Sequence, residues 1–451
     1  MPRYGPGIAS HAATPRARLE SFRLNLAFVP MLFVIGAVGV GFATVWLDIE
    51  LGEQSVRFPL LLTSTVDSAR AVLATIAGAT ITFAAIVFSV SLLMLQQTTT
   101  QFSSRVLAWF YRDSFTKRVM GTAAGTFAYC LVVLRSVRQP IDSGGTAVIP
   151  RVSVLVAVTL GILSVLMILA FINHVAHSME AGEVIRRITE EARAQIVRLC
   201  PHAAGTAPPI PVEGSRPAGD SLDVVAEDDG WVQHVDADRL IAIAPRDGVV
   251  MLDAGVGTFV AKGQRVCTIR PRPEDGTAYS ADEVRRAVHL GRTRTPAQDM
   301  ALGFRQLVDI ALRALSPGVH DPTTAVESVS HIGSLLRELL GRDLPPRIVA
   351  GEEGRRLFRP HDFDHADYVG LAFDQVRRAS TSEPVVGTAI LASIEDLVTD
   401  LEGGDLNERA RLLRDEAQLV VDGLRRGGLR AADLRAVEVI AERLELEDTS
   451  A

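Results

Sequence analysis

The sequence predicts an α-helical membrane bundle of about four transmembrane helices, followed by a cytoplasmic α+β region. Apolar runs crowd the first 175 residues of the 451, and charged residues crowd the rest. The mean hydropathy of +0.22 is therefore high for a chain with 22% charged residues. A stretch rich in Pro, Gly and Ala between Cys200 and Gly219 has the composition of a linker. We expect the two halves to face different solvents.

Five segments are expected along the chain. A short cytoplasmic tail precedes the membrane helices, and a juxtamembrane helix and linker follow them. A small barrel-sandwich-like β module then leads into a mainly helical cytoplasmic domain. The expected boundaries are 1–23 for the tail, 24–178 for the transmembrane domain, 179–219 for the juxtamembrane helix and linker, 220–275 for the β module and 276–451 for the helical domain.

The transmembrane helices are predicted from length and composition. A helix needs about 20 mostly apolar residues to cross a bilayer. The runs Leu24 to Leu47, Ala71 to Leu95 and Ser153 to His174 meet that length without an internal Asp, Glu, Lys or Arg. The run Val119 to Leu134 is shorter and contains Gly and Thr. Whether 119–134 spans fully or re-enters the membrane stays open, although four crossings place the N-terminus and the soluble part on one side.

The orientation is predicted from the Lys and Arg residues of the short loops, which favour the cytoplasmic side. Eleven lie on the side of the N-terminus and five on the other side, so we expect both termini in the cytoplasm. The eleven are Arg3, Arg16, Arg18, Arg23, Arg105, Arg112, Lys117, Arg118, Arg186, Arg187 and Arg193, and the five are Arg57, Arg70, Arg135, Arg138 and Arg151.

The second span carries a row of polar residues. Ser68, Thr75, Thr82, Ser89 and Gln96 recur every seven residues, beside a row of small side chains. Copies of this helix that meet around an axis would line a watery path with Thr75, Thr82, Ser89 and Gln96, because such hydroxyls can form pore walls. The alternative is close helix packing with hydroxyls bonded across the seam. Both interpretations place this face against protein.

Several functions are disfavoured. The span centres carry no ionisable residue of the kind that marks proton-coupled transport. The net charge of −7 argues against a nucleic-acid partner. The three cysteines are far apart and form no CxxC pair, so neither disulfides nor a cysteine zinc site is indicated. Because no nucleophile elbow, HExxH, P-loop or dinucleotide motif occurs, we predict no catalytic residue, cofactor or metal site.

The β module is predicted from period-two alternation that begins at Gly230. Its stretch Gly257 to Gln264 looks like the hairpin of barrel-sandwich folds related to lipoyl and biotinyl carriers. Lys262 lies inside the turn and not at an exposed tip, so we do not expect it to carry a lipoyl or biotinyl group. After Gly276 the pattern is helical.

One helix–turn–helix holds the densest set of polar residues. A helix ends at Ser316-Pro317-Gly318, and Asp321-Pro322 begins the next one as an N-cap followed by a first-turn proline. A helix N-terminus with hydroxyls and an arginine can bind a small anion such as phosphate. The ligand residues on this hypothesis are Arg313, His320, Asp321, Thr323 and Thr324. The alternative is a capped helix whose charges link neighbouring helices, with Asp321 itself in the anion's place.

Two histidine-containing clusters also have alternative interpretations. His361, Asp362, Asp364, His365 and Asp367 have metal-ligand chemistry, but Asp364 also suits the cap of a helix that begins at His365. The pair His174 and His177 at the end of the fourth span suits either a pH-sensitive gate or interfacial packing. Packing and capping are the favoured interpretations of both clusters.

Several passages resemble the bacterial membrane-protein family known as domain of unknown function 2254. They are Gln101 to Arg105 (QFSSR), Gly125 to Tyr129 (GTFAY), Gly230 to Gln233 (GWVQ), Arg313 to Ala325 (RALSPGVHDPTTA) and Asp367 to Phe373 (DYVGLAF). The family pattern commonly has Asn where this chain has His320. The resemblance implies a bacterial inner membrane, and it brings no established activity.

These observations predict a homo-oligomeric, channel-like protein of the lipid bilayer with a cytoplasmic ligand-sensing region. The polar row, the uncharged span centres and the soluble region close to the last span motivate this hypothesis. The alternative is a membrane-anchored scaffold or sensor that conducts nothing, and a membrane-bound enzyme is third.

Overall fold

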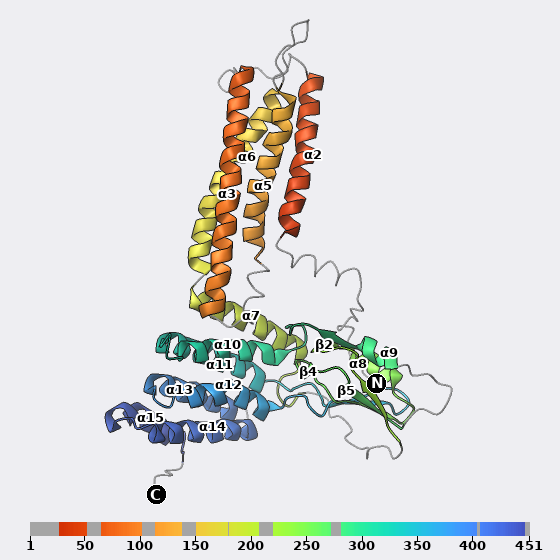
Figure 1. Ribbon diagram of the computed structural model, residues 1–451. Coiled ribbons are helices and arrows are strands. Elements are labelled where there is room, and N and C mark those ends of the chain that lie inside the picture. Colours follow the sequence, from red (N-terminus) through yellow and green to blue (C-terminus); the bar gives the residue numbers. More distant parts are fainter. Residues whose placement is uncertain are drawn as a thin grey trace. The chain divides into compact units, whose positions relative to one another are not determined.

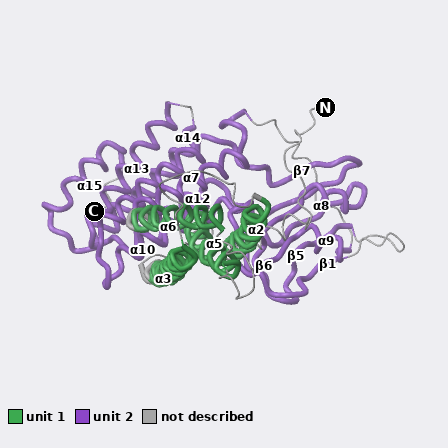
Figure 2. The backbone as a smooth tube through the Cα atoms, turned by 90° about the horizontal axis from the view of Figure 1, so that it is seen from above, with its two compact units in different colours: residues 1–180 green, residues 181–451 purple. Residues whose placement is uncertain are grey.

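The computed structural model describes residues 27–51, 65–101, 113–137, 150–178, 180–206, 220–271, 281–403 and 406–446. Figure 1 gives the order of the elements along the chain. The chain divides into two compact units, residues 1–180 and 181–451, which Figure 2 shows in different colours. The division agrees with the change of composition along the sequence.

The first unit is a bundle of four long helices. They are α2 (Phe28–Leu51), α3 (Val66–Gln101), α5 (Ser114–Ser136) and α6 (Arg151–Ser178). Each contains a segment long and apolar enough to cross a membrane. The prediction of four apolar helices is confirmed. The short run 119–134 lies within the 23-residue helix α5, which is long enough to span.

Helix α5 is the central helix of this bundle and contacts the other three. In the most apolar stretch of α5, 44% of the residues are buried in the bundle, compared with 6% in the corresponding stretch of α2. Gly121 and Gly125 permit this packing, because a Cβ atom at Gly121 would lie 2.8 Å from Cγ of Phe33 in α2. The small and polar residues that lowered the hydropathy of α5 therefore lie against protein.

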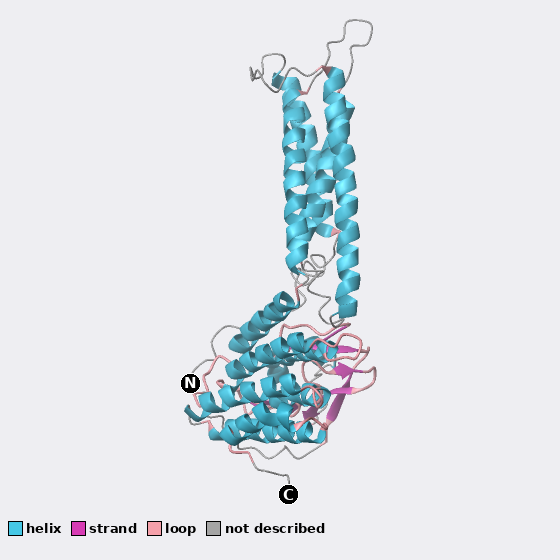
Figure 3. Cartoon of the chain, turned by 90° about the vertical axis from the view of Figure 1, so that its left-hand side faces the viewer, coloured by secondary structure: helices cyan, strands magenta, loops and turns pink. Residues whose placement is uncertain are grey.

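The second unit contains eight strands in two sheets among its described residues. The five-stranded sheet has the order β1-β5-β3-β8-β7, and the three-stranded sheet has the order β4-β2-β6. Both contribute to one apolar core, together with two short helices. Figure 3 shows the strands of this unit gathered beside its helices. The bounds are β1 (Leu222–Val225), β2 (Gly230–Val235), β3 (Val249–Leu252), β4 (Phe259–Val260), β5 (Arg265–Arg270), β6 (Val288–Gly291), β7 (Ile348–Ala350), β8 (Arg356–Phe358), α8 (Ala237–Ile243) and α9 (Ala281–Ala287).

The expectation that the chain is helical after Gly276 needs a correction. Strands β6, β7 and β8 come from that region, and β8 pairs in parallel with β3. These strands have only three or four residues, which is too short for a period-two pattern to be recognised. The barrel-sandwich assignment stays a prediction.

The remaining helices form a layered stack in the second unit (Figure 1). Helix α7 packs on α10 and α11, α11 packs on α13, and α13 packs on α14 and α15, while α12 contacts α10 and α14. Helix α11 begins at Pro322 and α12 begins at His365, as the sequence predicted. The helix bounds are α7 (Ala181–Leu199), α10 (Met300–Ala314), α11 (Pro322–Leu340), α12 (His365–Ala379), α13 (Pro384–Gly403), α14 (Asn407–Arg426) and α15 (Ala431–Arg443).

Candidate functional site

The predicted polar row lies on the outer face of α3. Thr75, Thr82, Ser89 and Gln96, which we call the α3 stripe, are all exposed in the isolated bundle. The opposite face of α3 is buried in the bundle through Leu73, Ala77, Thr80, Val87 and Met94. The structure therefore keeps the four residues on one helix face, and that face is not covered by the other three helices.

Two hydroxyls of the α3 stripe are hydrogen-bonded within their own helix, and the helix surface beside them is open. Thr75 Oγ1 donates to the carbonyl of Ala71 at 2.7 Å, and Thr82 Oγ1 donates to the carbonyl of Gly78 at 2.9 Å. No atom lies within 4 Å of a Cβ atom built on Gly78. A second helix has room to approach closely at this point.

One end of the bundle has a polar network that the sequence analysis did not identify. The carboxylate of Asp48 in α2 accepts hydrogen bonds from the backbone N–H groups of Val152 and Ser153, both at 2.9 Å. These are first-turn N–H groups of α6, so Asp48 caps that helix from a neighbouring one. Tyr129 Oη donates to the carbonyl of Ser153 at 3.0 Å and is 2.9 Å from Thr44 Oγ1.

The other end holds His174, one of the two histidines of the predicted pair. Its Nε2 atom lies 3.1 Å from a carboxylate oxygen of Asp113, which caps α5 through the N–H groups of Phe115 and Thr116. The ring of His174 also packs on Phe115, with centroids 4.8 Å apart. The His177 side chain lies outside the described residues. His174 therefore joins the ends of two helices, which agrees with the packing interpretation.

The α10–α11 corner contains the predicted anion ligands. Asp321 accepts hydrogen bonds from the N–H of Thr324 at 3.1 Å and from its hydroxyl at 2.6 Å. These bonds lower the pKa of Asp321, and the side-chain bond from Thr324 has the largest effect. The carboxylate thus occupies the helix N-terminus where an anion would bind. Pro322 follows as the first helical residue and offers no N–H group.

The other residues of the corner lie at its surface. Arg313 and Thr323 are exposed, and Nδ1 of His320 is 3.7 Å from a carboxylate oxygen of Glu383. His320 has a left-handed backbone with φ of 47°. The structure brings Asp321 and Thr324 together as a cap. Binding of an anion by Arg313, His320 and Thr323 stays a prediction.

The second polar cluster also forms a helix cap. Asp364 accepts from the N–H of Asp367, and Asp367 accepts from the N–H of Asp364, both at 2.9 Å. This reciprocal arrangement is a capping box at the start of α12. Nε2 of His365 is 3.2 Å from the carbonyl oxygen of Arg342. Asp364, His365 and Asp367 therefore make contacts within the protein, and Asp362 lies 3.2 Å from Arg359.

A buried ion pair links the β module to α10. Arg294 donates to both carboxylate oxygens of Asp299 at 2.7 and 2.8 Å, and the two side chains are 11% and 2% exposed. Burial raises the pKa of Asp299, and the charge of Arg294 opposes this effect. The guanidinium also lies 5.7 Å from the ring centroid of Trp231 in β2. A Cβ atom at Gly257 would lie 2.6 Å from Asp299 Oδ2, so only glycine fits beside this pair.

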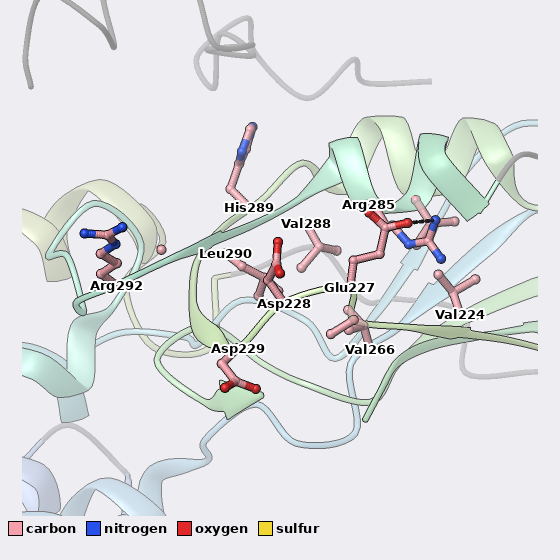
Figure 4. Close-up of a pocket in the computed structure, with 13 residues that line it drawn as sticks. Val224, Glu227, Asp228, Asp229, Val266, Arg285, Val288, His289, Leu290 and Arg292 are labelled. Carbon is pink, nitrogen blue, oxygen red and sulfur yellow. Dashed lines mark ion pairs between the residues drawn. The ribbon is translucent and has the colours of Figure 1, made fainter. Parts of the chain in front are cut away.

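A cavity of about 280 Å³ opens in the β module between the β1–β2 connection, α9 and β6. Figure 4 shows its charged rim: Glu227 pairs with Arg285 at 2.7 Å, while His289 points away from the other labelled side chains. Asp229 accepts a hydrogen bond from the N–H of Lys262. The lining also includes Asp228 and Arg292, so charged side chains of both signs surround the cavity.

Comparison with known families gives a clear result. The sequence profile of the family described as "Predicted membrane protein (DUF2254)" matches residues 23–396. The chain belongs to the DUF2254 family. It is similar to uncharacterized proteins of Mycobacterium bovis and Mycobacterium tuberculosis, each 32% identical over 359 residues, which are 79% of this chain and 68% of the relative. No solved structure matches the chain.

The passages that resemble DUF2254 have structural roles in this chain. Gly230 and Trp231 open β2 beneath Arg294, and Asp367 belongs to the capping box of α12. Tyr368 is buried against Phe304, with ring centroids 5.7 Å apart. In the QFSSR passage, 102–105 lie outside the described residues.

Proposed function

We propose that this DUF2254 member is a homo-oligomeric, channel-like protein of the bacterial inner membrane, with both termini in the cytoplasm and a ligand-sensing soluble region. The observation that carries the proposal is the exposure of the α3 stripe on the outside of the bundle. Thr75, Thr82 and Ser89 lie within the apolar span Val66–Met94, and hydroxyls at such positions suit a seam with a second helix or a wall facing water.

Close contact between copies is supported by the small residues beside the stripe. Ala71, Gly78 and Ala85 are exposed on α3, and small residues let helix backbones approach in membranes. Copies arranged around an axis would turn the stripe toward that axis. The hydroxyls and the amide would then line a path for water and ions.

The non-conducting scaffold or sensor has its own support. The hydroxyls of Thr75 and Thr82 are already bonded to their own helix. Ile86 and Leu93 beside the stripe are exposed apolar residues that suit lipid or a dry helix seam. On this alternative α3 packs against a partner without enclosing water.

Cysteine cross-linking in native membranes tests the oligomer. Thr82→Cys should form a disulfide-linked dimer on mild oxidation, because the stripe of one copy meets that of another. Ile81→Cys is the matched control, since Ile81 is exposed at the same depth but lies a third of a turn away. The native cysteines do not interfere, because Cys130, Cys200 and Cys267 are all buried. Equal cross-linking of both variants, or of neither, would contradict the proposed contact.

Reconstitution in a planar bilayer tests conduction. We expect a current from the wild-type chain and a much smaller one from Thr82→Phe, whose ring would narrow the path. Cross-linking of Thr82→Cys without any current would overturn the channel and support the scaffold. A current that Thr82→Phe leaves unchanged would remove α3 from the path.

A further inference from the structure

Two arginines flank one residue on the outer face of the five-stranded sheet. Val249 of β3 pairs with Arg270 of β5 on one side and with Arg356 of β8 on the other. Residues directly opposite one another point to the same face of a sheet. The neighbouring Val250 points to the other face, where it is buried with Ile269 and Leu357. The arginines thus share the face that turns away from the core.

Their spacing suits a single small anion. The arginines are separated by two strand intervals, which places their Cα atoms about 10 Å apart. Long side chains from such positions can converge above Val249. A guanidinium presents its donors in a planar fork that matches phosphate and carboxylate oxygens.

Neither arginine has a partner in the described part of the chain. Both are partly buried, and the Nε atom of each is buried without a hydrogen bond. The structure gives neither side chain any hydrogen bond or ion pair among the described residues. Arg355 also has an unbonded Nε, but its other nitrogens bond to the Ala242 carbonyl and to Glu353. A partly buried cation without a counter-charge is unfavourable, and an anion would relieve this cost.

The neighbouring carboxylates have other partners. Asp223 and Asp253 pair with Arg265 and accept hydrogen bonds from Thr268. Glu353 pairs with Arg246 and Arg355. These acids are therefore engaged, and the charge of the arginine pair is left to an external group.

The next row of the same face has an apolar part on the side of Arg356. Met251 lies two residues along β3 and pairs with Phe358 of β8, and both are partly buried. Ile348 of β7 continues this apolar part opposite Phe358. On the other side of Met251 the row continues with Thr268 and Asp223, which bond to each other. The arginines therefore lie beside Met251 and Phe358, which suits a ligand that carries both an anionic and an apolar part.

We propose that Arg270 and Arg356 bind the phosphate group of an organic phosphate whose apolar part packs on Met251 and Phe358. The site is separate from the α10–α11 corner and from the α3 stripe. It names a ligand class for the soluble region, and it does not depend on conduction. A nucleotide and a phospholipid share this chemistry.

Calorimetry on the full-length protein in detergent and phosphate-free buffer tests the site. The probes are adenosine monophosphate, dihexanoyl phosphatidic acid and pyrophosphate. We expect saturable binding of one of the first two, and weaker binding of pyrophosphate, which has no apolar part. Preference for the nucleotide points to a soluble ligand, and preference for the short phosphatidic acid points to a lipid head group. No saturable binding of any probe would overturn the proposal. Pyrophosphate binding as tight as that of the other probes would overturn the proposed contact of an apolar group with Met251 and Phe358.

Substitutions decide whether the arginines are responsible. Arg270→Gln and Arg356→Gln should each weaken binding about tenfold or more, because each removes charge-assisted hydrogen bonds. Arg270→Lys should lie between wild type and Arg270→Gln, since it keeps the charge and loses the fork. Arg337→Gln is the control, because Arg337 pairs with Asp400 on a surface helix. Wild-type affinity in the Arg270→Gln, Arg356→Gln double variant would overturn the site.

Folding and conduction are checked separately. We expect the double variant to melt at the same temperature as wild type or higher, because it removes two unpaired charges. If it fails to fold, Arg270→Lys still tests the loss of the fork. Ligand-free current should be unchanged in the double variant, so failure of this site and failure of the channel give different results.

Discussion

At the scale of single residues, Asp321 determines the chemistry of the α10–α11 corner. Its carboxylate caps α11 through Thr324, so Asp321→Ala should lower the free energy of unfolding by about 1 kcal/mol. Asp321→Asn should lose less, because asparagine is also a good N-cap. Thermal denaturation of the full-length protein in detergent measures both. A gain of stability in Asp321→Ala would show that the carboxylate is kept for another purpose, such as ligand binding.

The pH dependence of this cap follows from the direction of its pKa shift. Hydrogen bonds from Thr324 hold the pKa of Asp321 below its ordinary value. Its contribution is therefore fully present above the pKa of the unfolded carboxyl, about 3.9, and is lost as pH falls through the lower folded value. The stability difference between wild type and Asp321→Asn should shrink below about pH 4. A difference that grows as pH falls would contradict this assignment.

Arg294 and Asp299 should be the most sensitive pair outside the membrane helices. Asp299→Ala leaves a largely buried guanidinium unpaired, at a cost of about 3–5 kcal/mol. The double variant Arg294→Met, Asp299→Leu should recover much of this loss, because it removes both charges. Chemical denaturation of wild type, Arg294→Met, Asp299→Leu and the double variant gives the coupling energy of the pair. Equal destabilisation by the single and double variants would mean that packing dominates.

The sequence predicted one of these two arrangements. Asp321 and its helix are adjacent, so the Asp-Pro-Thr-Thr pattern alone predicts the cap. The environment of the Arg294–Asp299 ion pair is formed by Gly257 and Trp231. Both are distant in sequence and approach the pair only in the folded chain. The sequence shows that Arg294 and Asp299 are charged, but no local sequence pattern indicates that they form an ion pair.

At the scale of elements, the contact between α2 and α5 depends on glycine. Gly121→Val should lower the melting temperature of the purified protein by several degrees, because its Cβ atom would overlap the ring of Phe33. Gly39→Val is the matched control: Gly39 lies on α2 with no atom within 4 Å of the added Cβ. Fluorescence-detected melting in one detergent compares the two. Equal effects of both substitutions would contradict the packing of α2 on α5.

Helices were easier to predict than strands in this chain. Long apolar or amphipathic runs such as α3 and α11 carry their period over five turns or more, so the sequence located both helices. Helix α3 nevertheless begins five residues before and ends six residues after the predicted run Ala71 to Leu95. Strands β7 and β8 have three residues each and owe their place to pairing with β3. The arginine pair of the outer sheet face could not be found from sequence. Strands β5 and β8 come close together only because both pair with β3.

At the scale of the whole molecule, the orientation in the membrane is testable by fusions. The distribution of Lys and Arg predicts that both termini are cytoplasmic. A green fluorescent protein at the C-terminus should fluoresce, and alkaline phosphatase fused within 138–149 should be active. The reverse pattern would contradict the orientation predicted from Lys and Arg, and it would place the second unit on the other side of the membrane. Alkaline phosphatase at the C-terminus is the inactive control.

The central position of α5 has a consequence for biogenesis. With a mean hydropathy of 1.3, against 2.2 for α2 and α3, it is the span that a translocon would release into lipid least readily on its own. Its glycines and threonines become acceptable only when Phe33 of α2 and the α3 face around Leu73 are already in the bilayer. Synthesis from the N-terminus delivers those two helices first. The chain order thus supplies a docking surface before the helix that needs it leaves the ribosome.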